Sequence, residues 1–264
     1  MNSQPVFVGI DVGASMTKVA VLDAEKNLIG HYVKKSGTDF TATADFCLNE
    51  SLYMADVEKK DILMAVSTGY GRKNVTFAND TVTEIGCHAK GCYNYFPTSM
   101  TIIDIGGQDN KIIKLDELGR RSSFKMNRKC AAGTGAFLEE MSARLDIPLS
   151  EMDGLARHSE NLVRLGSYCT VFSATEVLEN IRNGKKLPDI IKGVFFSVVR
   201  RIMEMDSLTE KVVMTGGVVA HNPYLVNMME DMIGRSISVP EYPQLSGAMG
   251  AALHAMEKEQ VKIN

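Results

Sequence analysis

Short runs of apolar, often β-branched residues alternate along this chain with longer segments in which apolar residues recur every three or four positions. The short runs are typical of strands, and the periodic segments are typical of helices. Strands are predicted at Val6–Ile10, Lys18–Leu22, Asn27–Val33, Ile62–Thr68, Thr101–Ile105, Ile112–Leu115, Lys211–Thr215 and Ser236–Val239. Helices are predicted at Thr41–Met54, Glu84–Cys92, Ala136–Leu145, Ala174–Arg182, Asp189–Met205, Pro223–Ile233 and Gly247–Lys258. Because strand hairpins alternate with helices, we expect an α/β fold of two domains, each with a mixed sheet, and a cleft between them.

One part of this pattern occurs twice. The segment Val8–Asp23 aligns with Thr101–Asp116 without a gap, and each copy contains an apolar strand, an aspartate at its end, a glycine-containing turn and a second strand. Two such hairpins facing each other can hold the phosphates of a nucleotide and its metal ion. The matched residues are Asp11 and Asp104, Gly13 and Gly106, Lys18 and Lys111, Leu22 and Leu115, and Asp23 and Asp116.

The residue types in the two hairpins suit phosphate chemistry. Glycine lets backbone N–H groups approach phosphate oxygens closely. Asp11 and Asp104 are expected to hold Mg²⁺ directly or through water, and Gln108 is expected to orient an attacking water. The predicted catalytic residues are therefore Asp11, Asp104 and Gln108. The predicted nucleotide-binding residues are Gly13, Ala14, Ser15, Thr17, Lys18, Gly106, Gly107, Gly133, Thr134, Gly135, Glu176, Gly216 and Gly217.

These glycines could also be ordinary turn residues, as a lone glycine-rich hairpin usually is. Two matched Asp-x-Gly hairpins, together with a strand running into Gly216-Gly217, favour nucleotide binding strongly. Glu176 is open to a second interpretation as a plain surface carboxylate, and His88 is interpreted as a buried structural histidine.

Composition narrows the class of protein. The chain has 264 residues, 45% of them hydrophobic and 23% charged, with a formal net charge of -3. The bulk charge therefore indicates neither nucleic-acid nor membrane-surface binding. No apolar run approaches the roughly 18–20 residues of a membrane span, and the polar start suggests no signal peptide. A cytoplasmic location with reduced thiols is expected.

Two of the five cysteines, Cys130 and Cys169, each precede a predicted helix. The helix dipole and the free N–H groups at such a position stabilise a thiolate or a bound anionic cluster. Two cysteines are too few for a 4Fe-4S cluster, which normally takes four, but a symmetric dimer would supply the others. From the residues alone, buried structural cysteines are an equally good interpretation. No role is assigned to the other three, Cys47, Cys87 and Cys92.

The order of these motifs resembles the superfamily of actin, sugar kinases and heat-shock-chaperone ATPases, from about Val6 to Met256. The resemblance implies two ribonuclease-H-like, actin-like ATPase subdomains with mixed sheets flanking a nucleotide cleft. It assigns residues 1–97 to the first subdomain and 98–246 to the second. The helix at 247–260 returns to the first, and it and the helix at 84–91 match the superfamily's connecting helices.

Three segments carry a closer resemblance. Asp104-Ile-Gly-Gly-Gln-Asp109, Cys130-Ala-Ala-Gly-Thr-Gly135 and Cys169-Thr-Val-Phe172 are similar to segments of the ATPase activators of 2-hydroxyacyl-CoA dehydratases and the ATPase subunits of benzoyl-CoA reductase, the BadF/BadG/BcrA/BcrD type. The resemblance implies a homodimer with one 4Fe-4S cluster held by Cys130 and Cys169 of both subunits, besides ATP or ADP and Mg²⁺.

By the same resemblance, the protein is an ATPase that takes a low-potential electron from ferredoxin or flavodoxin. It passes the electron to a 2-hydroxyacyl-CoA dehydratase or a related iron–sulfur reductase. Two alternatives stay open at this stage: a small-molecule kinase of the same fold with Asp104 or Asp109 as base, and a nucleotide-gated module that forms filaments without iron. The residues do not identify the partner, its substrate, the electron donor or the redox potential of a cluster.

Overall fold

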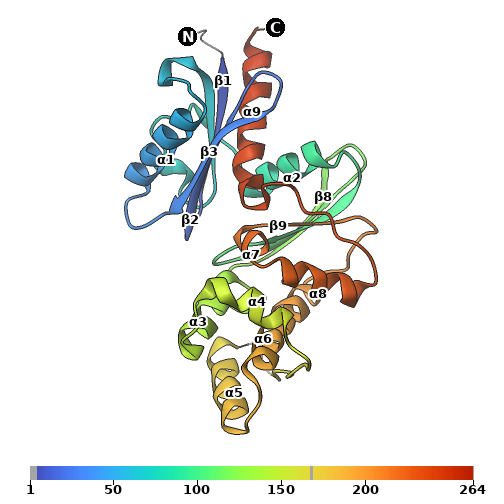
Figure 1. Cartoon of the computed structure of the whole chain (residues 1–264). Helices are drawn as coiled ribbons and strands as arrows, with labels where there is room; N and C mark the ends of the chain where they lie inside the picture. The colour runs from blue at the N-terminus through green and yellow to red at the C-terminus, as the bar shows by residue number, and fades with distance from the viewer. Residues whose placement is uncertain (1–4, 167–168, 264) are drawn as a thin grey trace. The chain divides into compact units, whose positions relative to one another are not determined.

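The structure is a computed structural model that describes residues 5–166 and 169–263. The chain divides into two compact units (Figure 1). Unit 1 contains Met1–Ser99, Leu115–Ser122 and Gln244–Asn264, and unit 2 contains Met100–Lys114 and Ser123–Pro243. Within the described residues, no helix is both long enough and apolar enough to cross a bilayer.

Unit 1 is built on a five-stranded sheet in the order β3-β2-β1-β4-β5. The central strand β1 pairs antiparallel with β2 and parallel with β4, so the sheet is mixed, as predicted. The strands of this sheet are β1 (Val6–Val12), β2 (Met16–Leu22), β3 (Leu28–Lys35), β4 (Ile62–Thr68) and β5 (Asp80–Thr81).

Helices cover both faces of this sheet, which explains why every residue of β1 is buried. Successive side chains of a strand point to opposite faces. Val6, Val8, Ile10 and Val12 pack in one core with residues of α1. On the other face a Cβ on Gly9 would lie 1.9 Å from the carbonyl oxygen of Ala248 in α9, so this glycine admits the helix. The helices of unit 1 are α1 (Phe40–Met54), α2 (Glu84–Tyr95) and α9 (Ser246–Ile263).

Unit 2 contains most of a four-stranded sheet in the order β8-β7-β6-β9, in which β6 and β9 run parallel. This order matches β3-β2-β1-β4 of unit 1, so the duplication seen in the sequence extends to the strand order. The strands are β6 (Met100–Ile105), β7 (Asn110–Leu115), β8 (Arg121–Asn127) and β9 (Val212–Thr215).

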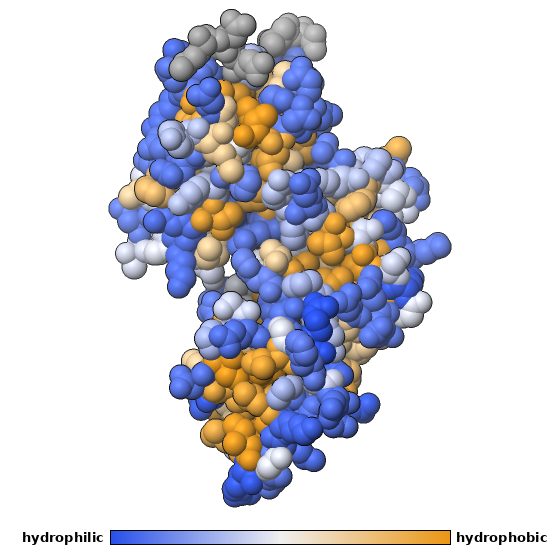
Figure 2. Space-filling view, in the orientation of Figure 1, coloured by the Kyte–Doolittle hydropathy of each residue, from blue (hydrophilic) through white to orange (hydrophobic). Residues whose placement is uncertain are grey.

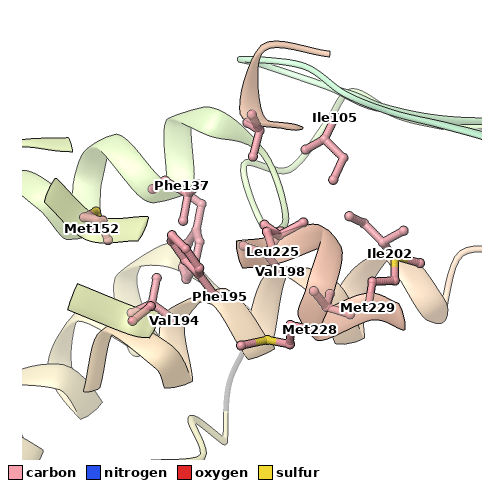
Figure 3. Close-up of a cluster of buried hydrophobic side chains, with 14 of the residues drawn as sticks. Ile105, Phe137, Met152, Val194, Phe195, Val198, Ile202, Leu225, Met228 and Met229 are labelled. Carbon is pink, nitrogen blue, oxygen red and sulfur yellow. The ribbon is translucent and has the colours of Figure 1, made fainter. Parts of the chain in front are cut away.

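The core of unit 2 lies between this sheet and its helices, and Figure 3 shows Phe137, Phe195 and Leu225 meeting there from three different helices. The amphipathic pattern predicted for Ala136–Leu145 is confirmed, because Phe137 and Met141 are buried. The helices of unit 2 are α3 (Gly135–Leu145), α4 (Met152–Arg157), α5 (Thr170–Arg182), α6 (Leu187–Met203), α7 (Gly217–His221) and α8 (Pro223–Ile233).

One predicted strand is wrong. Ser236–Val239 forms no strand, and its only ladder contact is an isolated bridge between Val213 and Ser238. The strands β5 and β8 and the helix α7 were not predicted. The residues of β8 are mostly exposed at the edge of the sheet, so the strand lacks the alternation of apolar and polar residues that marks a half-buried strand.

Candidate nucleotide and cluster site

The first hairpin joins β1 to β2 and places Asp11 at the end of a buried strand. The N–H of Gly13 donates to the carbonyl oxygen of Met16 at 3.0 Å and closes the turn. A Cβ on Gly13 would lie 2.9 Å from that oxygen, so the turn requires glycine. Lys18 Nζ donates to Asp11 Oδ2 at 3.0 Å, because the antiparallel register sets these two residues directly opposite each other.

The second hairpin, between β6 and β7, repeats this geometry in unit 2. The N–H of Gly106 donates to the carbonyl oxygen of Asp109 at 2.9 Å, and Lys111 Nζ donates to Asp104 Oδ2 at 3.0 Å. A Cβ on Gly106 would lie 2.8 Å from Asp109 Oδ1. In both hairpins the N–H of the first glycine is used within the turn. The amides of the residues that follow, Ala14 and Gly107 among them, are therefore the candidate donors to a phosphate.

The two aspartates differ in how their carboxylate oxygens are used. Asp104 accepts from Lys111 at Oδ2 and from Thr215 Oγ1 at Oδ1, the latter at 3.0 Å. Lys111 also bonds Asp109 Oδ1 at 2.8 Å, so its charge is shared between two carboxylates. Asp11 Oδ1, in contrast, is buried and has no hydrogen-bond partner among the described residues. A buried carboxylate oxygen without a partner is costly unless a ligand or water uses it.

That unused oxygen fits a magnesium ion. Mg²⁺ prefers oxygen ligands and usually keeps several of its waters, each of which can donate a hydrogen bond. Asp11 Oδ1 is an acceptor for such a water, whereas both oxygens of Asp104 already have protein partners. Of the two predicted metal-holding residues, Asp11 therefore fits the ion better.

Other predicted residues of the first hairpin lie around this turn. Ala14 is exposed, and Ser15 is half-buried at the turn. Thr17 is fully buried, and its Oγ1 lies 2.9 Å from Ser36 Oγ, which in turn donates to the carbonyl oxygen of Gly13 at 2.7 Å. The hydroxyl of Thr17 thus supports the turn from behind through Ser36, a residue that was not predicted to belong to the site.

In unit 2 the structure brings the predicted Gly133–Gly135 segment against the second hairpin. The N–H of Gly135 donates to the carbonyl oxygen of Gly106 at 2.9 Å, and Asn110 Nδ2 donates to that of Gly133 at 2.7 Å. Thr134 is fully buried, and its hydroxyl donates to the carbonyl oxygen of Ala131. These residues fix the shape of the hairpin through its backbone.

The Gly216-Gly217 segment also reaches this hairpin. Gly216 has a left-handed φ of 102°, and a Cβ there would lie 2.3 Å from the carbonyl oxygen of Ile105. Gly217 begins α7. Gln108 is exposed in the hairpin turn. Three segments that are far apart in the sequence therefore meet at one turn of unit 2.

Glu176 lies apart from these contacts. Its Oε2 accepts a hydrogen bond from the N–H of Gly166 at 2.5 Å, so it ties α5 to the loop before it. Sequence reasoning missed Lys111, Asn110 and Thr215 as parts of the site. The repeat offered a signal only for Lys111, which aligns with Lys18.

The five cysteines separate into two groups. Cys130 and Cys169 are exposed, whereas Cys47, Cys87 and Cys92 are buried. Burial raises the pKa of Cys87 to about 12 and that of Cys47 to about 11, so neither forms a thiolate at neutral pH. The two exposed cysteines are thus the ones whose accessibility suits metal ligation.

The helix context predicted for these two cysteines is correct only for Cys169. Cys169 is the N-cap residue of α5, which begins earlier than the predicted Ala174. Cys130 is not at a helix start, because α3 begins at Gly135 with Thr134 as its N-cap. The left-handed turn at Gly133, with φ of 81°, separates the thiol from the helix. The helix dipole therefore acts on Cys169 and has little effect at Cys130.

The comparisons with known proteins agree on one family. Residues 8–255 match the family described as the BadF/BadG/BcrA/BcrD ATPase family. The chain is 42% identical to the activator of lactoyl-CoA dehydratase of Anaerotignum propionicum over 97% of this chain and 99% of that one.

Two solved structures are similar over nearly their full lengths. Component A of the (R)-2-hydroxyglutaryl-CoA dehydratase of Acidaminococcus fermentans superposes with a TM-score of 0.92 at 36% identity, covering 97% of this chain and 99% of that one. The activator of the 2-hydroxyisocaproyl-CoA dehydratase of Clostridium difficile, with bound ADPNP, also has a TM-score of 0.92, at 37% identity, covering 98% and 97%.

Proposed function

Because the chain belongs to the BadF/BadG/BcrA/BcrD ATPase family and is therefore an ATPase, we propose that it activates a 2-hydroxyacyl-CoA dehydratase or a related iron–sulfur reductase by ATP-driven electron transfer. In this proposal the protein is a homodimer with one 4Fe-4S cluster, and ferredoxin or flavodoxin is its electron donor. The observation that carries the proposal is the exposure of two cysteines, out of five, in the unit that also contains a phosphate-binding type of hairpin.

The two hairpins are the proposed phosphate loops. Lys18 balances phosphate charge beside Asp11, and the turn amides donate to phosphate oxygens. Asp11 Oδ1 would accept a hydrogen bond from a water of a bound Mg²⁺, and the ion would supply positive charge to neutralise the phosphates. Gln108, exposed in the second turn, orients the attacking water without acting as a strong base. Asp104 keeps the second hairpin in shape through Lys111 and Thr215.

Cys130 and Cys169 are the proposed cluster ligands, two from each subunit of the dimer. When bound, a 4Fe-4S cluster supplies a one-electron carrier whose potential depends on its ligands, hydrogen bonds and solvent exposure. Cys169 places a thiolate at the N-terminus of α5, where the helix dipole favours negative charge.

Helix α5 also carries a surface that suits a second subunit. Val171, Phe172, Leu178 and Ile181 are each more than two-fifths exposed, and Figure 2 shows apolar residues gathered over α5. Contiguous exposed apolar residues mark interaction sites. A twofold axis beside Cys169 would cover part of this surface and bring four thiolates together.

ATP hydrolysis provides the free energy for the proposed transfer. Loss of the γ-phosphate removes contacts with the two hairpins, which makes them the element that distinguishes the ATP state from the ADP state. The α5 helix, which begins at a proposed ligand, is the segment through which that change would alter the surroundings of the cluster.

The test is the iron and acid-labile sulfide content of anaerobically purified protein, with its ATPase rate. We expect about four iron and four sulfide per dimer, both lost in Cys130→Ser and in Cys169→Ser, with ATP hydrolysis retained. Cys47→Ala is the matched control, because this buried thiol is not a proposed ligand. An iron-free protein that hydrolyses ATP in air, or phosphorylates a small molecule, would refute the proposal and favour the kinase.

A further inference from the structure

His88 is a buried side chain of α2 that the proposed mechanism does not use. It is only 5% exposed and lies on the side of α2 that faces α9. Its Nε2 lies 3.0 Å from the point that a Cβ on Gly247 would occupy, and Asp11 Oδ2 lies 3.1 Å from the same point. The imidazole and the carboxylate thus both border the place that a side chain at residue 247 would occupy.

Backbone contacts fix the orientation of the helix that carries this ring. A Cβ on Gly250 would lie 1.8 Å from the carbonyl oxygen of Cys87, and one on Gly91 would lie 2.2 Å from that of Ser246. The two helices therefore cross in direct backbone contact, so α2 cannot turn about its axis without a clash. All of these residues belong to unit 1, as does Asp11.

Two carboxylate groups lie near the imidazole ring. Glu84, one helical turn earlier, places Oε1 4.0 Å from His88 Nε2, and Asp11 lies on the other side of Gly247. A histidine that merely filled space would be expected among apolar side chains, since burying an imidazole beside carboxylates has a desolvation cost that its polar contacts must offset.

We propose that His88 is a positioning residue for Asp11. Lys18, whose side chain is 17% exposed, donates to Asp11 Oδ2, and in this proposal His88 limits the carboxylate across the backbone of Gly247. The carboxylate torsion of an aspartate is broad and roughly twofold, so one partner does not determine it. With Lys18 and His88 on either side of the carboxylate, Oδ1 would stay in place to accept a hydrogen bond from a water of a bound Mg²⁺. This inference rests on the proposed role of Asp11 in the ATP site.

Three substitutions test the inference: His88→Ala, His88→Gln and Gly247→Ala. Partners of metal-site ligands typically contribute 10- to 100-fold to activity or metal affinity. We therefore expect His88→Ala to lower kcat for ATP hydrolysis by about tenfold or more, with little change in KM for ATP, and to raise the Mg²⁺ concentration for half-maximal rate. His88→Gln should restore part of kcat, because its amide can still contact a carboxylate.

Gly247→Ala separates positioning from folding. Both side chains stay, but the added methyl group meets His88 Nε2 and Asp11 Oδ2 at about 3 Å and displaces one of them. Alanine is a better helix former than glycine, so reduced activity with an unchanged Tm would not come from a weakened α9. Because both changes act on the same place beside Gly247, the double variant His88→Gln/Gly247→Ala should lose less activity than the product of the single losses.

A binding measurement supplies a readout that does not depend on turnover. We expect the affinity for ADPNP without Mg²⁺ to be unchanged by His88→Gln, while the gain in affinity on adding Mg²⁺ becomes smaller. His254→Ala is the matched control: this histidine lies on α9, away from Asp11, and lines a cavity of about 720 Å³ with Lys90 and Glu257. Its kcat and Mg²⁺ dependence should equal those of the wild type.

The outcomes separate this inference from the proposed function. If Asp11→Asn retains wild-type hydrolysis, the proposed site and the role of His88 are both wrong. If Asp11→Asn is inactive while His88→Ala and Gly247→Ala keep the wild-type kcat and Mg²⁺ dependence, only the role of His88 is overturned. A parallel fall of Tm, kcat and Mg²⁺-free ADPNP affinity in all three variants would also overturn it, by assigning His88 a structural role.

Discussion

The repeated hairpin allows one substitution to be tested at two matched positions, Lys18→Met and Lys111→Met. Methionine approximates the length and apolar stem of lysine and removes the charge. The Lys111 side chain is 2% exposed and bridges Asp104 and Asp109, whereas that of Lys18 is 17% exposed and pairs with Asp11. Removing one partner of a buried ion pair leaves an uncompensated charge, at a cost of about 3–5 kcal/mol.

We therefore expect Lys111→Met to lower the free energy of unfolding by about 3–5 kcal/mol, and Lys18→Met by about 1–2 kcal/mol, since water reaches the latter pair. For a chain of this size, Tm falls by about 2–4 °C per kcal/mol, so the Lys111 variant should melt on the order of 10 °C lower. For the rate of ATP hydrolysis, measured well below both Tm values, we expect the opposite order, with Lys18→Met slower than Lys111→Met.

The chain has no tryptophan whose fluorescence could report unfolding, so thermal melts are best followed by far-UV circular dichroism. Adding Asp104→Asn to Lys111→Met is the control: it removes the orphaned charge and should restore part of the lost stability. Equal Tm losses for the two lysine variants, or a greater loss for Lys18→Met, would refute the reasoning that burial of the pair sets the cost. No rescue by Asp104→Asn would show that the charge was not the cause.

Three further predictions concern single sites. Gly216→Ala should destabilise the protein by about 1–3 kcal/mol in urea unfolding, because residue 216 has a left-handed φ of 102°, whereas Gly154→Ala, which meets no atom within 4 Å, should not. A hydrogen bond from Ser159 lowers the pKa of Asp189 in the folded protein. The stability that this carboxylate contributes is therefore present above the unfolded-state pKa of about 3.9 and is lost as pH falls through the lower folded value. Asp189→Asn should weaken the fall of Tm with acid in melts between pH 2 and pH 5, and an unchanged dependence of Tm on pH would contradict this prediction. Leu178 is 51% exposed on α5, and Leu178→Glu should convert the proposed dimer to a monomer in light scattering. The iron content should fall, while the rate of ATP hydrolysis per chain persists. An intact dimer would place the interface elsewhere.

Elements with a strong local pattern were predicted from the sequence to within a few residues. Ile62–Thr68 and Pro223–Ile233 have the predicted bounds, because the first is a buried apolar run and the second begins at a proline and ends before a left-handed glycine. The prediction failed where the pattern of apolar residues does not follow the hydrogen bonding between strands. β8 is a polar edge strand, and Ser236–Val239, although apolar in part, has one bridge and no ladder.

The sequence by itself determined the two hairpins and the pairing of lysine with aspartate inside the first, since a tight turn between antiparallel strands sets Asp11 opposite Lys18 whatever the rest of the chain does. The tertiary structure alone decided how the two copies differ. Thr215, 111 positions beyond Asp104, satisfies the second carboxylate oxygen there, while Asp11 Oδ1 has no such partner among the described residues. The placement of His88 and Asp11 around Gly247 is likewise a matter of tertiary structure, because it depends on how α2 and α9, which are far apart in the sequence, pack against each other. Local geometry follows from neighbouring residues, whereas these differences depend on long-range packing that no local pattern encodes.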